Sequence, residues 1–365
     1  MMEKTTVGNT AEKRNRGERR LRIHFFKNGL RPRANRSILI SIFAALALLI
    51  PSGCGAGEQS SPEGSPVSDA GSPADAVMSV YASFYPMYDF AVKIGGDKVN
   101  AVNMTPSGTE PHDWEPTAAD ISGLEAADVF IYNGAGMEHW AEDIMETLQS
   151  SKLTVVEASK GIELIEGGHG HDEEEEEHED EDEEEEEHEE EGFDPHVWLN
   201  PMYAKVEMGN IRDAFKLIDP ANGEYYDANY TKYAAELDAL DKEFTDALSE
   251  FPDRDIIVAH QAFGYMCSAY ELNQVPIEGL SPDSEPDPAR MAEIIEFASE
   301  HNINVIYFEE LVSPKVAETI AEAIGAETDV LNPLEGLSDD DIASGADYFT
   351  VMRSNLEALR RGFLR

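Results

Sequence analysis

The sequence predicts an α/β protein of two lobes, each with a mainly parallel sheet flanked by helices, joined by one long rigid α-helix. After residue 76, short apolar and β-branched runs alternate with segments of helical periodicity, as expected when crossover helices connect parallel strands. This alternation is interrupted once, by an acidic run and then by a helical pattern too long for an ordinary crossover.

The first lobe is expected over residues 77–215. Thr117 is a suitable N-cap for its second helix, with Asp120 in the first turn, and Gly95-Gly96 ends its first helix. The expected strands are 77–84, 98–105, 128–134 and 152–159, and the expected helices are 85–94, 117–127 and 138–149.

A linking helix is expected over 216–251, followed by the second lobe over 252–365. Apolar residues recur in the linking helix at the 3.6-residue period, at Tyr226, Tyr230, Tyr233, Ala234, Leu237, Leu240, Phe244 and Leu248. In the second lobe the expected strands are 255–260, 273–280, 303–310 and 327–334, and the expected helices are 264–271, 288–301, 314–324 and 347–360.

Residues 1–53 have the order of a bacterial secretion signal. Eleven Lys or Arg lie within 1–36, and the apolar run SILISIFAALALLI (37–50) is short for a membrane-spanning helix. Small residues then precede Cys54, which predicts cleavage and lipidation at Cys54, although Pro51 stands where Leu is usual. The alternative is an uncleaved anchor with a chance cysteine, and a start codon assigned too far upstream stays open; both the lipoprotein and the anchor interpretation export the rest of the chain.

Residues 54–76 are rich in Gly, Ser, Pro and acids, which predicts a flexible tether. An anchor, a tether and a folded domain place the protein at the outer face of the cytoplasmic membrane. Cys267 stands alone in an apolar helical pattern, and we expect it to be a buried free thiol.

The chain is strongly acidic, with a formal net charge of −47. Eighteen of the acids lie within 172–191, in a run that also holds histidines at or near it: His169, His171, His178 and His188. Such a surface argues against nucleic acid, whose phosphates need Lys and Arg, and suits cations. The hydrophobic fraction of 41% is enough for a folded core.

Ligands of open α/β sheets bind at the carboxyl ends of the strands, so the residues directly after each expected strand are the candidates for a site. His112 lies in the loop after 98–105, the strand 255–260 ends in His260, and the strand 327–334 runs into Glu335; His196 comes shortly after the acidic run. Three imidazoles and one carboxylate form a ligand set that suits tetrahedral zinc, with two ligands from each lobe.

Each candidate also has a structural interpretation. His112 and Glu335 could be solvated loop residues, His196 could pack on Trp198, and His260 could be a satisfied, half-buried histidine. Their shared position at strand ends favours the metal site. His139 and His301 lie on or at the end of expected helices and are expected at the surface, whereas Glu110 and Asp113 flank His112 and either support it or face solvent.

Four motifs resemble those of the metal-binding lipoproteins of ABC importers, the cluster A-I zinc/manganese solute-binding proteins. They are SGTEPHDWEP (107–116), DPHVWLNP (194–201), IVAHQAFGY (257–265) and VLNPLEGL (330–337), and the resemblance covers nearly all of 78–363. It implies a metal site in the cleft between the lobes, with His112, His196, His260 and Glu335 as ligands. It also implies an ABC permease with its cytoplasmic ATPase as the partner, a monomeric protein and no catalysis.

The resemblance also bears on the metal. Manganese members typically have a carboxylate at the position of His260, so three histidines and Glu335 resemble the zinc branch, and imidazole suits zinc. Manganese import is the alternative. Zinc members often carry a His-rich acidic loop before the second ligand, but here histidines are few and acids many. Some zinc members also have a disulfide in the second lobe. Here Cys267 has no partner for one except Cys54.

The His- and acid-rich loop 167–192 is too charged to fold by itself. Its expected role is to collect zinc near the site through its four histidines and to raise the local cation concentration. The alternative is a solubilising insertion with no role in transport.

The leading hypothesis is a lipoprotein that captures Zn²⁺ and delivers it to a permease. A filled four-ligand site leaves no open position for an activated water, so an enzyme is not expected. A secreted zinc hydrolase could use Glu335 as its base, but the chain has no HExxH motif. A surface adhesin is the remaining alternative from another class, and the sequence shows no recognition surface for it.

Overall fold

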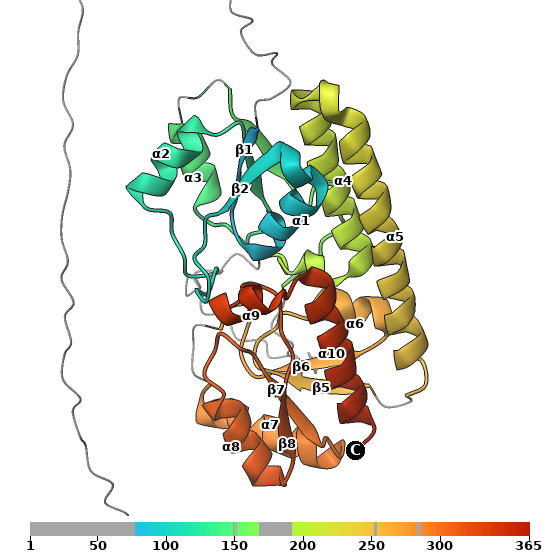
Figure 1. Ribbon diagram of the computed structural model, residues 1–365. Helices are drawn as coiled ribbons and strands as arrows, with labels where there is room; N and C mark the ends of the chain where they lie inside the picture. The colour runs from blue at the N-terminus through green and yellow to red at the C-terminus, as the bar shows by residue number, and fades with distance from the viewer. Residues whose placement is uncertain (1–76, 149, 151, 168–191, 252–253, 283–285) are drawn as a thin grey trace, which may run out of the picture. The chain divides into compact units, whose positions relative to one another are not determined.

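The computed structural model describes residues 77–148, 150, 152–167, 192–251, 254–282 and 286–365. These residues form two sheets of four parallel strands, which confirms the expected α/β architecture (Figure 1). The first sheet has the order β2-β1-β3-β4 and the second the order β6-β5-β7-β8, so the two halves repeat one topology. The strands are β1 (Met78–Ala82), β2 (Val99–Asn103), β3 (Val129–Tyr132), β4 (Thr154–Glu157), β5 (Asp255–Val258), β6 (Asn273–Pro276), β7 (Val305–Phe308) and β8 (Glu327–Val330).

Helices connect the strands in each half. The first half contains α1 (Tyr85–Gly95), α2 (Ala118–Ala126) and α3 (Ala141–Thr147), and the second contains α6 (Gly264–Tyr270), α7 (Pro288–Glu300), α8 (Lys315–Ile324), α9 (Asp339–Ser344) and α10 (Tyr348–Phe363). The N-cap expected at Thr117 is confirmed, because its side chain accepts from the backbone N–H of Asp120 while the Asp120 carboxylate accepts from that of Thr117. None of the described helices is both long and apolar enough to cross a membrane.

The central strands carry apolar residues on both faces because each sheet is covered on two sides. In β3, Val129 and Ile131 belong to the main core, whereas Phe130 between them packs with Trp140 and Leu124 on the other face. In the second sheet, Ile257 and Ile306 likewise pack with α7 and α8, while their neighbours in the strands face the main core.

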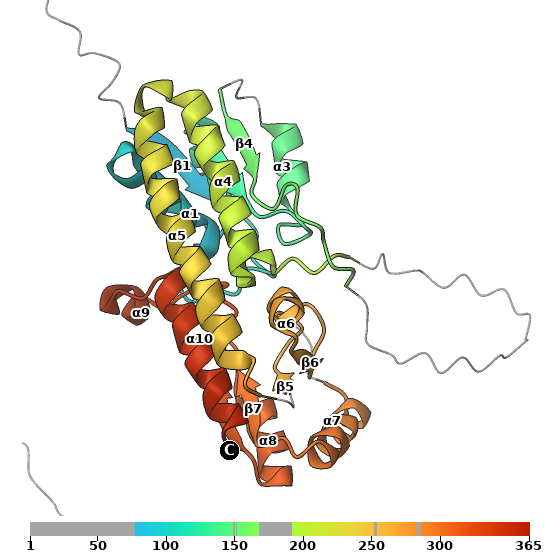
Figure 2. The same ribbon diagram turned by 90° about the vertical axis from the view of Figure 1, so that its right-hand side faces the viewer.

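The connection between the two sheets contains the expected long helix and a second helix that was not expected. It consists of two helices, α4 (Pro201–Ile218) and α5 (Gly223–Leu248), which contact each other over much of their length. Figure 2 shows α5 running beside α4 and then past α10. The expected helix start at 216 was therefore too early, because α4 ends at Ile218 and Pro220 separates the two helices.

Two helices were not predicted, for different reasons. α4 carries a clear signal: the Asn200 side chain caps it, Pro201 occupies its first turn, and Ala204, Met208, Ile211 and Phe215 are buried at helical spacing. α9 carries only a local signal, since it has six residues, none of them buried, and is defined by the Ser338–Asp341 capping box.

The main core extends through both halves. It includes residues of the first sheet, of α4 and α5, of the second sheet and of α10. α5 has 26 residues, about 39 Å at 1.5 Å per residue, and contacts α1 in the first half as well as α6 and α10 in the second. This shared core makes the two sheets parts of one packed unit. Cys267 lies in it as a buried free thiol, as expected.

A buried ion cluster ties α10 to the first half. Lys93 of α1 donates to Asp89 and to Asp347, the N-cap of α10, at 2.8 Å each. The ammonium also lies over the rings of Tyr233 and Phe349. Burial opposes the ionisation of Asp347, but the hydrogen bonds from Lys93 and Thr350 and the charge of Lys93 together outweigh this effect and lower the pKa of Asp347.

Replacing Lys93 with methionine should destabilise the fold by about 3–5 kcal/mol, because it leaves two partly or fully buried carboxylates without their cation. A lowered pKa of Asp347 means that its contribution is present above the ordinary aspartate pKa and is lost as pH falls through the lowered value. The loss measured by urea unfolding should therefore be smaller in acid than at neutral pH. Lys232→Met is the control, since Lys232 is exposed over the same Tyr233 ring; equal losses for both variants would contradict this account.

Candidate metal centre

The four predicted side chains converge on one point. His196 Nε2 lies 3.2 Å from His112 Nε2, 3.3 Å from His260 Nε2 and 2.9 Å from Glu335 Oε1. Glu335 Oε1 is also 3.2 Å from His260 Nε2 and 3.4 Å from His112 Nε2. Among the described residues this is the one group of His, Cys, Asp or Glu side chains with the spacing of metal ligands.

These separations have the size of the edges of a zinc tetrahedron. Ligand atoms about 2.0–2.1 Å from a central ion, at tetrahedral angles, are about 3.3–3.4 Å apart. Five of the six ligand–ligand separations lie between 2.9 and 3.4 Å. Three imidazole nitrogens and one carboxylate oxygen are also a donor set that zinc favours. The group could therefore hold one zinc ion with little rearrangement.

Parallel-sheet topology brings the side chains together from distant parts of the chain. His112 lies in the loop after β2, His260 follows β5, and Glu335 follows β8. His196 directly precedes a short 3-10 helix, Val197–Leu199, that leads into α4. The loops after strands of the two sheets thus supply three of the four side chains, as the sequence predicted, and the segment before α4 supplies His196.

The site is closed on most sides. His196 and His260 are fully buried and Glu335 is 1% exposed, while the His112 side chain retains 10% exposure. Exchange of an ion with solvent is therefore easiest on the side of the His112 loop. That loop is itself attached to the Glu335 loop, because Gly108 N donates to Leu337 O.

Buried carboxylates orient two of the imidazoles. Asp194 Oδ1 accepts from His196 Nδ1 at 2.8 Å, and Glu309 Oε1 accepts from His260 Nδ1 at 2.7 Å. A proton held at Nδ1 leaves the Nε2 lone pair free for a metal and makes the imidazole a stronger donor. Glu309 and His260 follow the adjacent strands β7 and β5, at the point where the strand order of the second sheet reverses.

The Glu335 loop is held from both sides. Asn355 of α10 donates to Asn332 O and accepts from Asn332 N, while Glu310 accepts from the Asn332 amide. Trp198 Nε1, from the first half, donates to Pro333 O at 2.8 Å. These bonds fix the backbone just before Glu335, and this fixes the position from which the Glu335 side chain reaches the imidazoles.

The first sheet supports His196 in a comparable way. Asn133, after β3, donates from its side chain to Pro195 O at 2.9 Å. Its own backbone N–H donates to Glu138, which also accepts from Ser83 Oγ after β1. The point where the strand order reverses in the first sheet therefore holds the backbone of the His196 loop. In the second sheet the corresponding point carries a candidate ligand, His260, directly.

Charge in the site is balanced between the imidazoles and Glu335. Burial opposes protonation of His260 and His196, but the carboxylates beside each outweigh it and raise both pKa values. Burial likewise opposes ionisation of Glu335, yet the charge of His260 and the hydrogen bonds from three imidazoles hold its pKa well below its usual value. Protons and a metal ion would compete for the same Nε2 atoms.

Glu110 supports the His112 loop and does not face solvent. Its Oε1 accepts from His112 N, and burial followed by the charge of Glu335 raises the pKa of Glu110 to about 9. Asp113 is exposed. From the sequence, Glu110 was expected either to support His112 or to face solvent, and the first of these is confirmed.

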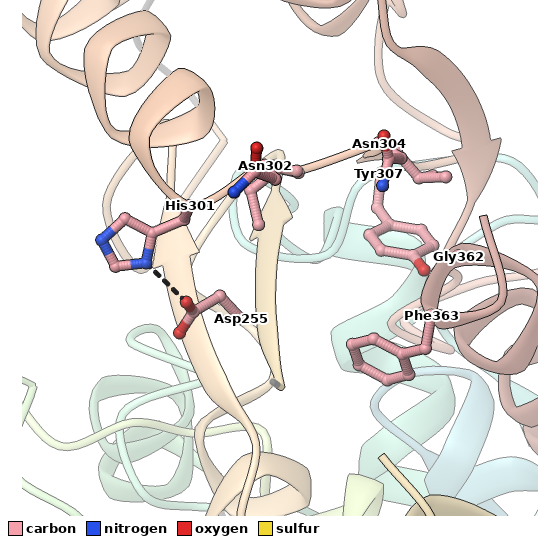
Figure 3. Close-up of a pocket in the computed structure, with 9 residues that line it drawn as sticks. Asp255, His301, Asn302, Asn304, Tyr307, Gly362 and Phe363 are labelled. Atoms are coloured by element: carbon pink, nitrogen blue, oxygen red, sulfur yellow. Dashed lines mark hydrogen bonds and ion pairs between the residues drawn. The ribbon is translucent and has the colours of Figure 1, made fainter. Parts of the chain in front are cut away.

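The histidines set aside from the sequence lie away from the centre. The His139 side chain is 54% exposed, and that of His301 is 43% exposed. His301 pairs with Asp255 at 2.7 Å beside a cavity of about 280 Å³ at the amino end of the second sheet (Figure 3). Of the described residues that line this cavity, one is a histidine and one an aspartate, too few for a closed zinc site. His169, His171, His178, His188 and Cys54 lie outside the described residues.

A family model described as zinc-uptake complex component A, periplasmic (ZnuA) matches residues 80–362. The chain belongs to the ZnuA family. It is 45% identical over 287 residues to the high-affinity zinc uptake system protein ZnuA of Bacillus subtilis strain 168, across 79% of this chain and 88% of that relative. The resemblance to the cluster A-I binding proteins is thereby confirmed.

Two further relatives extend the comparison. The ZnuA-family chain is 41% identical over 292 residues to the zinc-binding protein AdcA of Streptococcus pyogenes serotype M1, across 79% of the chain but only 56% of that relative. It thus spans little more than half of that protein. The crystal structure of the Zn(II)-bound ZnuA-like domain of Streptococcus pneumoniae AdcA has a TM-score of 0.67 at 35% identity, covering 80% of this chain and 100% of that one.

Replacing Glu309 with glutamine should weaken zinc binding by about 10- to 100-fold, because it removes the charge that strengthens His260 as a donor. Competition with a chromophoric chelator measures the change. Asp255→Asn is the matched control, since it alters the same kind of carboxylate–Nδ1 pair far from the centre. A Glu309→Gln affinity equal to that of the control would show that Glu309 has no part in metal binding.

Proposed function

We propose that this ZnuA-family chain is an extracytoplasmic lipoprotein that captures one Zn²⁺ and delivers it to an ABC permease for import. The ligands proposed are His112, His196, His260 and Glu335. The observation that supports this most strongly is the set of separations of 2.9–3.4 Å among their ligand atoms. The names of the B. subtilis and S. pyogenes relatives, which refer to zinc uptake and zinc binding, agree with it.

Zinc is favoured over manganese by the donors themselves. Manganese prefers oxygen ligands and octahedral sites, whereas three of the four donors here are imidazole nitrogens. The burial of three of the four side chains leaves little space for the water ligands that would complete an octahedron.

The burial of the site also favours a binding protein over an enzyme. A metallohydrolase needs an open coordination position for water and a general base. Here Glu335 contacts all three imidazoles, so it occupies a corner of the ligand set and is not free to act as a base. The burial of these four groups concerns metal binding alone; an adhesin would use a surface elsewhere, so adhesion stays the alternative from another class.

Release to the permease is proposed to begin at His112. It is the most exposed of the four ligands, and its loop has no regular secondary structure between β2 and α2. The shared core and α5 limit relative movement of the two sheets. Local displacement of the His112 loop on docking is therefore a smaller change than opening the whole molecule.

Attachment at the membrane is proposed through Cys54. The streptococcal relatives include a zinc-binding lipoprotein AdcA of S. pneumoniae serotype 4, which is consistent with a lipid anchor. Metabolic labelling with a fatty acid, compared between the native chain and Cys54→Ala, tests this part separately from metal binding.

The exported chain, offered limiting zinc and manganese together, should retain one tightly bound zinc ion. Because His260 is buried within the ligand set, His260→Ala should lower zinc affinity by more than about 100-fold, beyond the effect of altering a supporting residue. His139→Ala, at an exposed histidine, should leave the affinity unchanged. Preferential retention of manganese would overturn the proposed cargo, and unchanged affinity in His260→Ala would overturn the proposed ligands.

The acidic segment 168–191 can be removed without straining its ends. Gly167 N donates to Gly192 O at 2.8 Å, and Glu166 pairs with Phe193 as an antiparallel bridge, so the two ends already lie side by side. Replacing 168–191 with Asn-Gly, which favours a two-residue hairpin turn, should keep the single tight zinc and abolish weaker additional zinc binding in calorimetric titrations. Loss of the tight zinc with the segment would mean that the main site is not the four-ligand group.

A further inference from the structure

Asp194, the carboxylate that orients His196, lies against the first turn of α6 from the other half of the molecule. Its Oδ1 accepts from both Nδ1 and the backbone N of His196, at 2.8 and 2.9 Å. Its other oxygen occupies the space where the side chain of residue 264 would begin. A Cβ on Gly264 would lie 2.3 Å from Asp194 Oδ2, a distance that real Cβ atoms do not adopt.

The backbone does not require glycine at position 264. Gly264 is not among the glycines with positive φ, and it is the first residue of α6. Glycine is a poorer helix residue than alanine, so local stability would favour a side chain here. Among the described residues outside its own turn, Asp194 Oδ2 is the only atom closer than 3.0 Å to the added Cβ; the next, Gln274 Nε2, is at 3.4 Å, an ordinary contact. The space left by the missing side chain is therefore filled by the carboxylate.

The next residue holds the backbone of Asp194. Tyr265 Oη donates to Asp194 O at 2.8 Å and accepts from Ile165 N at 3.0 Å. Asp194 N in turn donates to Ile165 O, so the tyrosine hydroxyl joins two paired chain segments to α6. The tyrosine is 1% exposed and its ring lies edge-on to Tyr203 of α4, which keeps the hydroxyl in place.

The position of Asp194 is not explained by stability alone. The residue is 1% exposed, and its Oδ2 has no hydrogen-bond partner within the described part of the chain. A buried carboxylate oxygen without a partner destabilises a fold. What the arrangement does provide is a fixed direction for Oδ1, and through it for the ring of His196.

We propose that Gly264 and Tyr265 are positioning residues for the metal site: they form a seat for Asp194 that fixes the His196 imidazole. The inference rests on the proposed zinc-binding function. Gly264 and Tyr265 follow His260 by four and five residues in the same short segment. One segment of the second half therefore supplies the third ligand and also sets the geometry of the second, which comes from the first half.

The test is a pair of conservative variants of the full exported chain, each with a matched control. Gly264→Ala should displace the Asp194 carboxylate, and Tyr265→Phe should remove only the hydroxyl. Gly209→Ala in α4 is the control for the first, since its Cβ would meet Tyr230 at an ordinary 3.6 Å. Tyr270→Phe is the control for the second, because Tyr270 lies in the same helix and its hydroxyl binds Asp241, away from the site.

Zinc affinity is measured by chelator competition and ligand geometry by the visible absorption of the Co²⁺-loaded protein. Gly264→Ala is expected to weaken zinc binding by about 10-fold or more and Tyr265→Phe by several-fold, the range for residues that orient metal ligands. Both should change the Co²⁺ spectrum without lowering the melting temperature of the metal-free chain more than the controls do. A purely structural role would lower that melting temperature and leave the spectrum of the loaded protein unaltered.

A double-mutant cycle with Asp194→Ala decides whether the effect passes through Asp194. In the Asp194→Ala background the added Cβ has no carboxylate to displace, so Gly264→Ala should cause no further loss of affinity. Full additivity of the two losses, or wild-type affinity in both Gly264→Ala and Tyr265→Phe, would overturn the inference. Failure of this inference can be told apart from failure of the proposed function. Unchanged zinc affinity in His260→Ala would contradict the proposed function, whereas the results above contradict only the role of Gly264 and Tyr265.

Discussion

The structure depends on the close approach of three imidazoles and a carboxylate in a largely buried position. Polar groups in such a place are costly unless each is paired. Here each ring places Nε2 next to Glu335, and the rings of His196 and His260 also give Nδ1 to a second carboxylate. A divalent cation bound at this point would compete with protons for the same Nε2 atoms.

The fold supplies this convergence through repetition. Two sheets of the same strand order each end in loops that carry candidate ligands or the residues that support them. Supporting hydrogen bonds connect each half to the loops of the other. From the first half, Trp198 donates to the Glu335 loop; from the second half, Tyr348 of α10 donates to Trp198 O and Tyr265 of α6 donates to Asp194 O. Because the ligand loops are anchored in the opposite half, a change in one half alters the geometry of the other. A site built in this way favours one coordination geometry over an adaptable one.

His112, His260 and Glu335 could be predicted because the signal is topological, whereas His196 follows no strand and was singled out by its place shortly after the acidic run. Parallel strands end at a common edge, so a histidine or glutamate directly after a strand is placed by the strand pattern alone. The supporting residues obey no such rule. Asp194 could have been suspected from its place two residues before His196, but Glu309 and Asn355 are 49 residues from His260 and 23 from Asn332. Nothing in a local pattern specifies those pairings.

The two unpredicted helices illustrate the same limit at the level of secondary structure. The sequence of α4 has an N-cap, a proline in the first turn and an apolar stripe. It was not predicted because the acidic run lies just before it and the longer helical pattern of α5 was interpreted as the whole connection between the lobes. α9 has no apolar stripe, so only its capping box marks it. The need for glycine at position 264 was beyond prediction, since it arises from a carboxylate 70 residues earlier in the sequence.

The most direct measurement of the central claim is zinc K-edge X-ray absorption on the protein loaded with one equivalent of zinc. The account predicts four light ligands at about 2.0–2.1 Å, with multiple-scattering features that fit three imidazoles and a single carboxylate. A five- or six-coordinate, oxygen-dominated environment with one imidazole or none would contradict it, because the ion would then lie outside the group formed by His112, His196, His260 and Glu335.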